Sequence, residues 1–115
     1  MTDAQNMVTL SVKALEEKKG RDITVLDISK VSVLADYFII VSGDNDRQVS
    51  ALTDAVDEAL TRGGYEKKNI EGYHTGNWIL LDYNDVIIHV FNRESRAFYD
   101  LERLFSDAKR VELPF

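Results

Sequence analysis

The feature that most constrains the fold is an apolar ribbon in the second half of the chain, residues 78–91. Its aromatic and β-branched residues form two stretches separated by residues 83–85 (Tyr-Asn-Asp), which are typical of a turn. We therefore expect two strands joined at this turn. Acidic residues bracket the turn, and His89 stands among β-branched residues, where a purely structural hairpin needs no polar group. This mixture indicates a surface that another macromolecule contacts.

Helix and strand signals alternate along the rest of the chain. Helices are predicted where apolar residues recur at helical spacing between cap and stop residues, and strands where apolar runs alternate or are continuous. The predicted helices extend from Thr2, which with Gln5 resembles a capping box, to Gly20; from the turn residues 42–44 to 63–64; and from the cap residue Asn92 to Phe105. The predicted strands outside the ribbon are 22–28, 36–43 and 69–74, the last of them weak, polar and near a sheet edge.

This order of elements predicts the fold class. It fits an α/β fold with a mixed β-sheet of about five strands and flanking helices. The run at 36–43 is so continuously apolar that it should be a central strand covered on both faces. With 115 residues, 44% of them hydrophobic, residues 1–115 should form a single domain whose tail from about 109 is loosely attached. The third helix should bury a stripe made of Ala97, Phe98, Leu101, Leu104 and Phe105.

Charge and composition exclude several classes of protein. Twenty acidic and fourteen basic residues give a net charge of −6. Free nucleic acid is not expected as the principal partner, because binding it requires Lys and Arg to neutralise phosphates; a basic protein surface is the better match. The chain has no cysteine, which excludes disulfides and thiolate metal sites. No apolar run approaches the roughly 20 residues of a membrane span and no signal segment is found, so we expect a soluble, cytoplasmic protein without a membrane partner.

Signals for catalysis are weak. A nucleotidyl-transfer site needs a Gly-Ser turn before a helix and two carboxylates that point at one Mg²⁺ ion. Ser42 and Gly43 show the turn in reversed order. Asp82 and Asp85 flank a turn instead of alternating along one strand, so turn chemistry explains them more simply. His89 is expected to be a hydrogen-bonded structural or interface residue. We predict no catalytic residue, no bound metal and no cofactor.

Alternation along the first strand of the ribbon divides it into two faces. Trp78, Leu80 and Asp82 should share one face, and the odd-numbered residues up to Tyr83 the other. Both faces carry large apolar groups, so one packs on helices and the second needs cover from another helix or from a partner. Trp78 is suited to anchor an interface, and the alternative, that it completes the core, fits the pattern equally well. Tyr99 falls off the stripe of the third helix and is a further candidate for contact.

Several blocks of residues, taken together and in order, carry a family resemblance. They are Val33-Leu34-Ala35-Asp36-Tyr37-Phe38, Ser42-Gly43 with Asp46-Arg47-Gln48-Val49, Glu71-Gly72, Trp78-Ile79-Leu80-Leu81-Asp82-Tyr83, Asp85-Val86 with His89-Val90-Phe91, and Arg96 with Phe98-Tyr99 and Leu101-Glu102-Arg103-Leu104. These blocks resemble ribosomal silencing factors of the RsfS/Iojap family, over nearly everything from about Gly20 to Phe105. Asn84 stands where the family often has Gly, a departure consistent with a left-handed turn residue.

The resemblance implies a regulator without enzymatic activity. Members of this family bind the large ribosomal subunit at its intersubunit face, through the ribosomal protein called L fourteen. They sterically block joining of the small subunit and so lower translation when nutrients are scarce. The implied fold is similar to that of nucleotidyltransferases without their catalytic carboxylates. Organellar relatives carry an extra N-terminal targeting region for which this chain has no room, so a bacterial cytoplasmic member is expected.

The expected contacts with the large subunit lie around the ribbon. The residues of first rank are Trp78, Leu80, Asp82, Tyr83, Asp85 and His89, and those of second rank are Asp36, Tyr37, Arg96 and Tyr99. Two alternatives stay open. One is a nucleotidyltransferase-like enzyme or nucleotide-binding protein, and the other is an adaptor that forms a homodimer through the same face when it is not bound to the ribosome.

Overall fold

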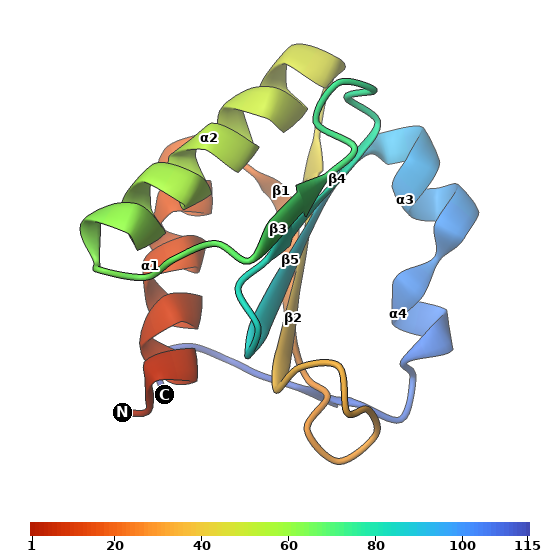
Figure 1. Cartoon of the computed structure of the whole chain (residues 1–115). Helices are drawn as coiled ribbons and strands as arrows, with labels where there is room; N and C mark the ends of the chain where they lie inside the picture. The colour runs from red at the N-terminus through yellow and green to blue at the C-terminus, as the bar shows by residue number, and fades with distance from the viewer.

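The chain folds into helices on both faces of one mixed β-sheet, which confirms the predicted α/β class (Figure 1). A computed structural model describes all 115 residues. In chain order its elements are α1 (Asp3–Glu17), β1 (Arg21–Asp27), β2 (Tyr37–Gly43), α2 (Asp46–Arg62), β3 (Asn69–Glu71), β4 (Trp78–Asp82), β5 (Val86–Asn92), α3 (Arg93–Tyr99), α4 (Leu101–Leu104) and β6 (Lys109–Arg110). None of these helices has the length and apolar character needed to span a membrane.

The strands lie in the order β3-β4-β5-β2-β1-β6. The sheet thus has six strands, where about five were expected. β2 and β5 run parallel at the centre, and every other neighbouring pair is antiparallel. Because parallel strands need a long crossover, the chain passes from β2 to β5 through α2 and the β3–β4 edge. α1 and α2 cover one face of the sheet, and α3 and α4 lie on the other (Figure 1).

Each face of the sheet has its own hydrophobic core. The larger core, of 18 buried residues, packs the sheet against α1 and α2, and a smaller core of 7 buried residues lies on the other face. β2 contributes to both cores and all its residues are buried, as predicted for a strand covered on both sides. Trp78 and Leu80 of β4 and Phe105 after α4 are only partly buried against the smaller core. The face of α3 and α4 is therefore the less completely covered one.

The first two helices begin at side-chain caps. Thr2 and Gln5 form the predicted capping box, in which the backbone N–H of each donates to the side chain of the other at 3.1 Å. The N-cap of α2 is Asn45, whose side chain accepts the N–H of Gln48 at 2.8 Å. The predicted cap residues 42–44 fall in and just after β2, because that strand keeps pairing with β5 to its end.

The predicted third helix is broken in two. α3 begins at the predicted cap Asn92, whose side chain accepts the N–H of Ser95 at 2.8 Å. Asp100 then adopts a left-handed conformation, with φ 48°, and separates α3 from α4. The two short helices therefore do not share one continuous buried face, and Phe98 before the break and Leu104 after it are 80% and 74% exposed. The predicted buried stripe is wrong at these two residues and at Ala97, which is also exposed, because it assumes one unbroken helical period.

The C-terminal residues return along the sheet instead of hanging loosely from about 109. β6 pairs with the end of β1, and Val111 and Leu113 pack against the larger core. The ring of Phe115 meets that of Tyr37 edge-on, with centroids 5.7 Å apart. The sequence conceals this pairing because a two-residue strand with exposed basic side chains shows no apolar alternation.

The predicted edge strand 69–74 is shortened to β3 by a glycine. Gly72 has φ 80°, which turns the chain away from the sheet. A Cβ at this position would also stand 2.1 Å from the carbonyl oxygen of Trp78. Glycine alone fits both the conformation and the close approach. Gly72 therefore sets the path by which the chain reaches Trp78 at the start of β4.

Candidate docking surface

The hairpin of β4 and β5 presents two different faces, as the alternation predicts. Ile79, Leu81 and Tyr83 are buried in the larger core, against α1 and α2. Trp78 and Leu80 lie on the opposite face and are partly buried. The exposed apolar area of this strand is therefore on the side of α3 and α4.

A row of aromatic rings crosses that face from β5 to α3. Trp78 stacks on the buried Phe91 with ring centroids 5.0 Å apart and contacts Tyr99 at 4.4 Å, while Phe98 meets Tyr99 edge-on at 5.1 Å. Exposure rises along the row, from none at Phe91 to 43% at Tyr99 and 80% at Phe98. We call Trp78, Leu80, Phe98 and Tyr99 the aromatic surface.

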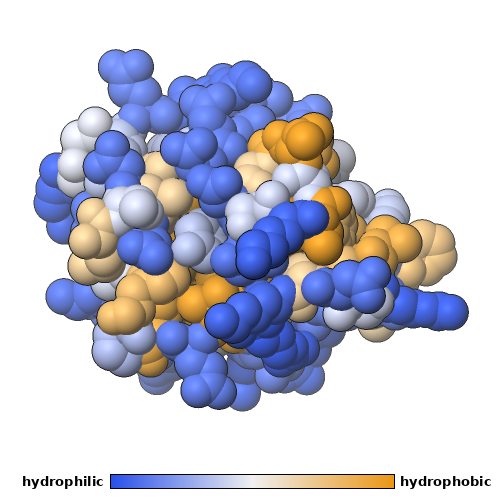
Figure 2. Space-filling view, turned by 90° about the horizontal axis from the view of Figure 1, so that it is seen from below, coloured by the Kyte–Doolittle hydropathy of each residue, from blue (hydrophilic) through white to orange (hydrophobic).

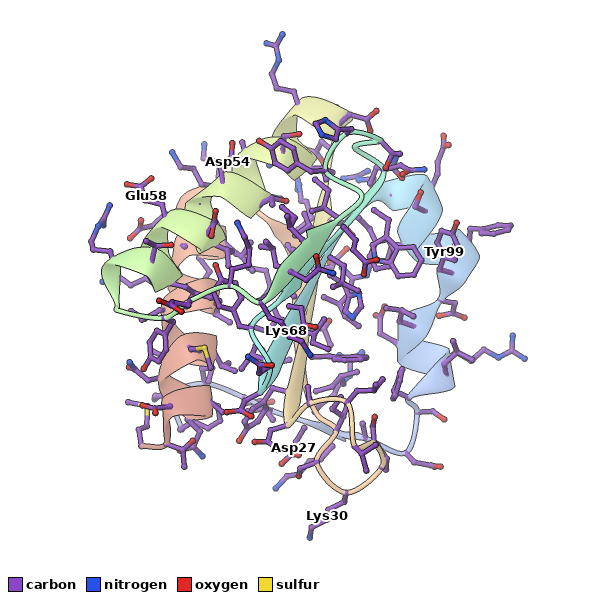
Figure 3. The ribbon with its side chains drawn as sticks, viewed as in Figure 1. Asp27, Lys30, Asp54, Glu58, Lys68 and Tyr99 are labelled. Carbon is purple, nitrogen blue, oxygen red and sulfur yellow. The ribbon has the colours of Figure 1, made fainter.

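The aromatic surface belongs to one side of the molecule. Figure 3 shows Tyr99 on α3, the helix that faces the β4–β5 side of the sheet. Seen from below, apolar residues interrupt the mostly hydrophilic surface in several places, one of which is the right, the side of α3 and α4 (Figure 2). Further exposed apolar residues occur on α4 and in the loop after β1, namely Leu104, Val33 and Leu34. Sequence reasoning assigned none of these residues, nor Phe98, to the contact surface.

His89 supports the aromatic surface from below. Its Nδ1 accepts a hydrogen bond from the indole Nε1–H of Trp78 at 3.2 Å. The imidazole is 4% exposed, and Phe38 contacts it edge-on with centroids 4.7 Å apart. The prediction of a hydrogen-bonded residue is confirmed, but His89 is structural in this conformation and does not reach the surface.

The hydrogen bond determines the protonation of His89. Since an indole N–H can only donate, Nδ1 must be unprotonated, and a neutral imidazole then carries its proton on Nε2. Burial favours this neutral form and lowers the pKa of His89 to about 4. The Nε2 atom is buried without a hydrogen-bond partner. An unpaired buried donor lowers the stability of the folded state by about 1–3 kcal/mol. Accepting the bond from Trp78 at Nδ1 places the imidazole proton on Nε2, where it has no partner.

The predicted turn residues have the expected structural roles. Asn84 has φ 69°, and its N–H donates to the Asp82 carboxylate at 2.8 Å. The carbonyl oxygen of Asp85 accepts the N–H groups of Asp36 at 2.9 Å and Tyr37 at 3.1 Å, which ties the turn to the start of β2. No three Asp, Glu or His side chains of the chain come together in an arrangement that could hold a metal ion.

Tyr83 is a buried link between the sheet and α2. Its hydroxyl donates to Asp57 at 2.7 Å, and Lys67 forms an ion pair with the same carboxylate at 3.1 Å. Burial and this hydrogen bond raise the pKa of Tyr83. Burial alone would raise the pKa of Asp57, but the hydrogen bonds from Tyr83 and Lys67 outweigh it and lower that pKa. Tyr83 is thus engaged inside the fold.

Arg96 clamps the helices of this face to the sheet. Its guanidinium forms two hydrogen bonds with Glu102 of α4, at 3.1 and 3.2 Å. It also donates to the hydroxyls of Ser42 at 3.0 Å and Thr24 at 3.1 Å. The side chain is only 12% exposed. Arg96 therefore holds α3 and α4 against β1 and β2, and it leaves little of its charge for a partner.

The carboxyl ends of β2 and β5 are where an enzyme of this fold class would bind its ligand. α2 follows β2 on one face and α3 follows β5 on the other, and a hollow of about 480 Å³ opens there. Asp44 lies between Arg21 at 3.3 Å and Arg93 at 3.1 Å, and Asn92 donates to Asp46 at 3.3 Å. The chain's own carboxylates thus neutralise the cations that a nucleotide phosphate needs. This geometry does not favour the nucleotide-binding alternative.

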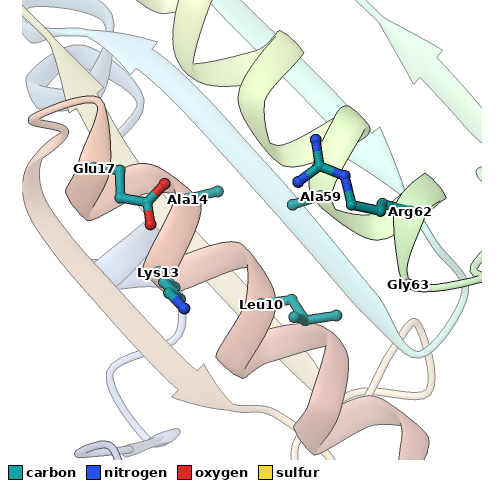
Figure 4. A pocket seen from close by; sticks show the side chains of 7 residues that line it. All are labelled: Leu10, Lys13, Ala14, Glu17, Ala59, Arg62 and Gly63. Atoms are coloured by element: carbon teal, nitrogen blue, oxygen red, sulfur yellow. The ribbon is translucent and has the colours of Figure 1, made fainter.

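A second hollow lies between α1 and α2, on the far side of the sheet from the aromatic surface (Figure 4). It measures about 360 Å³, and its rim carries Lys13, Glu17 and Arg62. Arg62 is paired with Glu58 of the same helix. Small-molecule sites are lined mainly by apolar and aromatic side chains, whereas this hollow has three charged residues and no aromatic residue in its lining.

The predicted contact residues therefore separate into three groups. Exposed or partly exposed are Trp78, Leu80, Asp82, Asp85, Asp36 and Tyr99. Buried are Tyr83, His89 and Tyr37, and nearly buried is Arg96. Only the first group can touch a partner without a rearrangement of the fold.

Comparison with known proteins identifies the family. A family model described as "Ribosomal silencing factor during starvation" matches residues 1–115. The chain is 38% identical over 109 residues to a ribosomal silencing factor RsfS of Halalkalibacterium halodurans, covering 95% of this chain and 93% of that protein. A ribosomal silencing factor RsfS of Bacillus subtilis is 34% identical over 111 residues, covering 96% and 94%.

A solved structure agrees with these relatives. A crystal structure of a Chromobacterium violaceum protein superposes with a TM-score of 0.89 at 36% identity, covering 99% of this chain and 92% of that one. The resemblance on which the sequence analysis relied is thus confirmed along the whole chain. This chain belongs to the RsfS/Iojap family of ribosomal silencing factors.

Proposed function

We propose that this protein binds the large ribosomal subunit through its aromatic surface, blocks association with the small subunit and represses translation when nutrients are limited. The partner is ribosomal protein L fourteen at the intersubunit face, and the place of action is the cytoplasm, where bacterial subunits join. The observation that carries the proposal is an exposed aromatic surface on a member of a family named for ribosomal silencing.

The aromatic surface has the properties of an interface anchor. Trp78 and Tyr99 are held by stacking before any partner arrives, so little side-chain freedom is lost on binding. Phe98 adds a ring that the protein itself leaves 80% exposed. Binding energy in protein interfaces is concentrated in such aromatic groups. A partner that covers these rings gains about 25 cal/mol of binding free energy per Å² of apolar surface removed from water.

Charge at the rim supports a basic protein as the partner. The chain carries a net charge of −6, and Asp36, Asp82 and Asp85 are exposed or partly exposed near the β4–β5 turn and the start of β2. Bare ribosomal RNA would repel this charge, whereas a basic ribosomal protein attracts it. Binding should therefore weaken as salt rises, by screening of the acidic rim.

Occlusion follows from the size of the protein. Its principal extents are 33 × 32 × 24 Å. Two surfaces make contact only when their atoms approach to about 4 Å. A body that stands at least 24 Å high on the intersubunit face therefore keeps the two subunits apart over its footprint. No catalytic step is needed for this effect.

Replacing Phe98 by Arg tests the proposed surface. Because Phe98 is 80% exposed, Phe98→Arg removes docking area and adds a charge that a basic partner repels, while the cores remain intact. We expect cosedimentation with purified large subunits to weaken by at least about tenfold, as for loss of an interface anchor.

Ala51→Arg is the matched control, because Ala51 is exposed on α2, on the other face of the sheet, and the net charge changes equally. This variant should bind as the wild type does. Equal binding by Phe98→Arg and the wild type would show that the docking face is elsewhere. Equal weakening by both Arg variants would show that binding depends on net charge alone.

Self-association through the same surface is a second proposal for the unbound protein. Light scattering should then show a dimer. Large subunits should promote its dissociation, and Phe98→Arg should prevent it from forming. A monomer at all accessible concentrations would reject this proposal and leave ribosome docking untouched.

A further inference from the structure

We infer that His89 is a positioning residue for docking: its Nδ1 holds the indole of Trp78 in the orientation that the large subunit contacts. This inference rests on the proposed function. It assigns to a buried residue, away from the surface, a specific contribution to partner affinity.

The geometry links the two side chains across neighbouring strands. Trp78 of β4 lies opposite Phe91 of β5, and His89 lies opposite Leu80, so Trp78 and His89 are diagonal neighbours on one face. The indole Nε1 donates to Nδ1 of His89 at 3.2 Å. Diagonal neighbours of this kind are within reach of aromatic side chains.

The bond decides which part of Trp78 faces outward. The indole has one polar atom, and that atom is directed to the buried imidazole. The exposed remainder of Trp78 is hydrocarbon, continuous with Tyr99 through their 4.4 Å contact. A partner therefore meets an apolar ring that offers no competing donor. Without an acceptor at position 89, the indole N–H would seek water and turn the ring out of the row.

The hydrogen-bonding capacity of the imidazole is only half used inside the fold. Nε2 is buried and has no hydrogen-bond partner. Around it lie the rings of Phe38 and Phe91, where an apolar side chain would pack without an unpaired donor. The acceptor atom Nδ1 is the one part of His89 with a partner. Through this hydrogen bond, His89 orients the indole of Trp78.

The unmodified protein provides the first test. Trp78 is the only tryptophan, so the indole N–H gives a single NMR resonance. We expect that resonance to be shifted downfield and slow in exchange with solvent. The ¹⁵N signals of His89 should show a neutral ring protonated at Nε2. Protonation at Nδ1, or a fast-exchanging indole N–H, would overturn the inference without any variant.

Variants at position 89 then connect the bond to docking. His89→Leu removes the acceptor, and His89→Asn places a carbonyl oxygen near the position of Nδ1. We expect affinity for large subunits to fall about tenfold in His89→Leu, the worth of one hydrogen bond, and to be mostly restored in His89→Asn. The protected indole resonance should likewise be lost in the first and kept in the second.

Val90→Ala is the control for stability alone. Val90 is the adjacent residue of β5, buried in the core on the other face, so this change lowers stability without touching Trp78. If Val90→Ala weakens docking as much as His89→Leu, or if Asn fails to rescue, His89 has a structural role only. If the wild type itself fails to bind large subunits, the proposed function falls, whatever the NMR signals show.

Discussion

His89 carries a bond to Trp78 and an N–H without an acceptor, on a sheet face that is otherwise apolar around it. At the scale of single residues, His89 is the polar residue of the ribbon whose burial has the clearest effect on stability. The group is neutral in the folded protein and free to ionise in the unfolded chain. Stability must therefore depend on pH in the range where only the unfolded chain binds the proton.

The expected direction follows from the two pKa values. Burial lowers the pKa of His89 from 6.5 to about 4 on folding. Between these values the unfolded state binds more protons, so the free energy of unfolding is full above pH 6.5 and falls as the pH drops toward 4. The loss due to His89 is about 3 kcal/mol over this window. Urea unfolding from pH 7.5 to 4 measures it.

His89→Leu is the reference for this titration. Carboxylates such as Asp27 and Asp57 also contribute as the pH falls, and they do so in both proteins. The difference between wild type and variant isolates the imidazole. An equal pH dependence in the two proteins would mean that His89 is not buried as a neutral group.

Local patterns made some residues predictable and left others hidden. The turn at Asn84 is stabilised by Asp82 two residues away, so sequence neighbours suffice to predict it. The partner of His89 lies 11 residues away on another strand, and the bond depends on the register between β4 and β5. No spacing rule supplies that register, which is why His89 was assigned to the contact surface.

At the scale of elements, the path of the chain into β4 depends on Gly72. Gly72→Ala should destabilise the protein for two reasons, the left-handed φ of 80° and the clash of Cβ with the Trp78 carbonyl oxygen. The φ strain alone costs roughly 1–2 kcal/mol, and relief of the clash should add at least about 2 kcal/mol by displacing backbone. Urea unfolding followed by Trp78 fluorescence measures the sum.

Gly64 offers a control for the strain alone. It has φ 89°, but a Cβ there meets no atom within 4 Å. Gly64→Ala should therefore show the cost of the left-handed conformation and leave Trp78 undisturbed. Equal losses in the two variants would show that the loop before β4 adjusts freely and that Gly72 does not set the position of Trp78.

The attachment of α3 and α4 depends on Arg96. Arg96→Met keeps much of the aliphatic stem and removes the bonds to Glu102, Ser42 and Thr24. Because it leaves a partly buried carboxylate without its cation, we expect a loss of about 3 kcal/mol in unfolding free energy. Hydrogen exchange should accelerate in α3 and α4 first.

Arg103→Met, at an exposed position of α4, controls for the loss of one positive charge. This variant should leave hydrogen exchange in α3 and α4 unchanged and should change the free energy of unfolding by no more than about 0.5 kcal/mol. If α3 and α4 stay protected in Arg96→Met, the apolar contacts of Leu101, Phe105 and Tyr99 suffice to hold the short helices.

Apolar periodicity predicts the boundaries of some helices and strands and not of others. The sheet strands and the first two helices follow from apolar spacing and caps, because these elements pack on a core along their length. The last helix is different. Asp100, in the left-handed region, separates α3 from α4, so the two helices do not share one continuous buried face, and Phe98 is exposed. Aspartate favours helix caps and turns, but the regular apolar spacing across residues 97–105 conceals the break. The most exposed part of the aromatic surface was therefore missed.

At the scale of the whole molecule, the protein has a net charge of −6, an exposed aromatic surface, and exposed carboxylates at the β4–β5 turn and the start of β2. Fold and charge together account for selective attraction to a basic protein partner, and the 24 Å least extent accounts for occlusion. The class of fold was predictable from the order of elements. The exact docking face was not, because it depends on which side of the sheet α3 and α4 leave incompletely covered.

The most direct test of this account is a subunit-joining assay. Purified large subunits are incubated with the protein, small subunits are added, and light scattering follows the formation of joined ribosomes. We expect joining to fall in proportion to the fraction of large subunits that the wild type occupies, and Phe98→Arg to need an at least about tenfold higher concentration for the same inhibition. Normal joining by large subunits that cosedimentation shows to be saturated with the wild-type protein would contradict it.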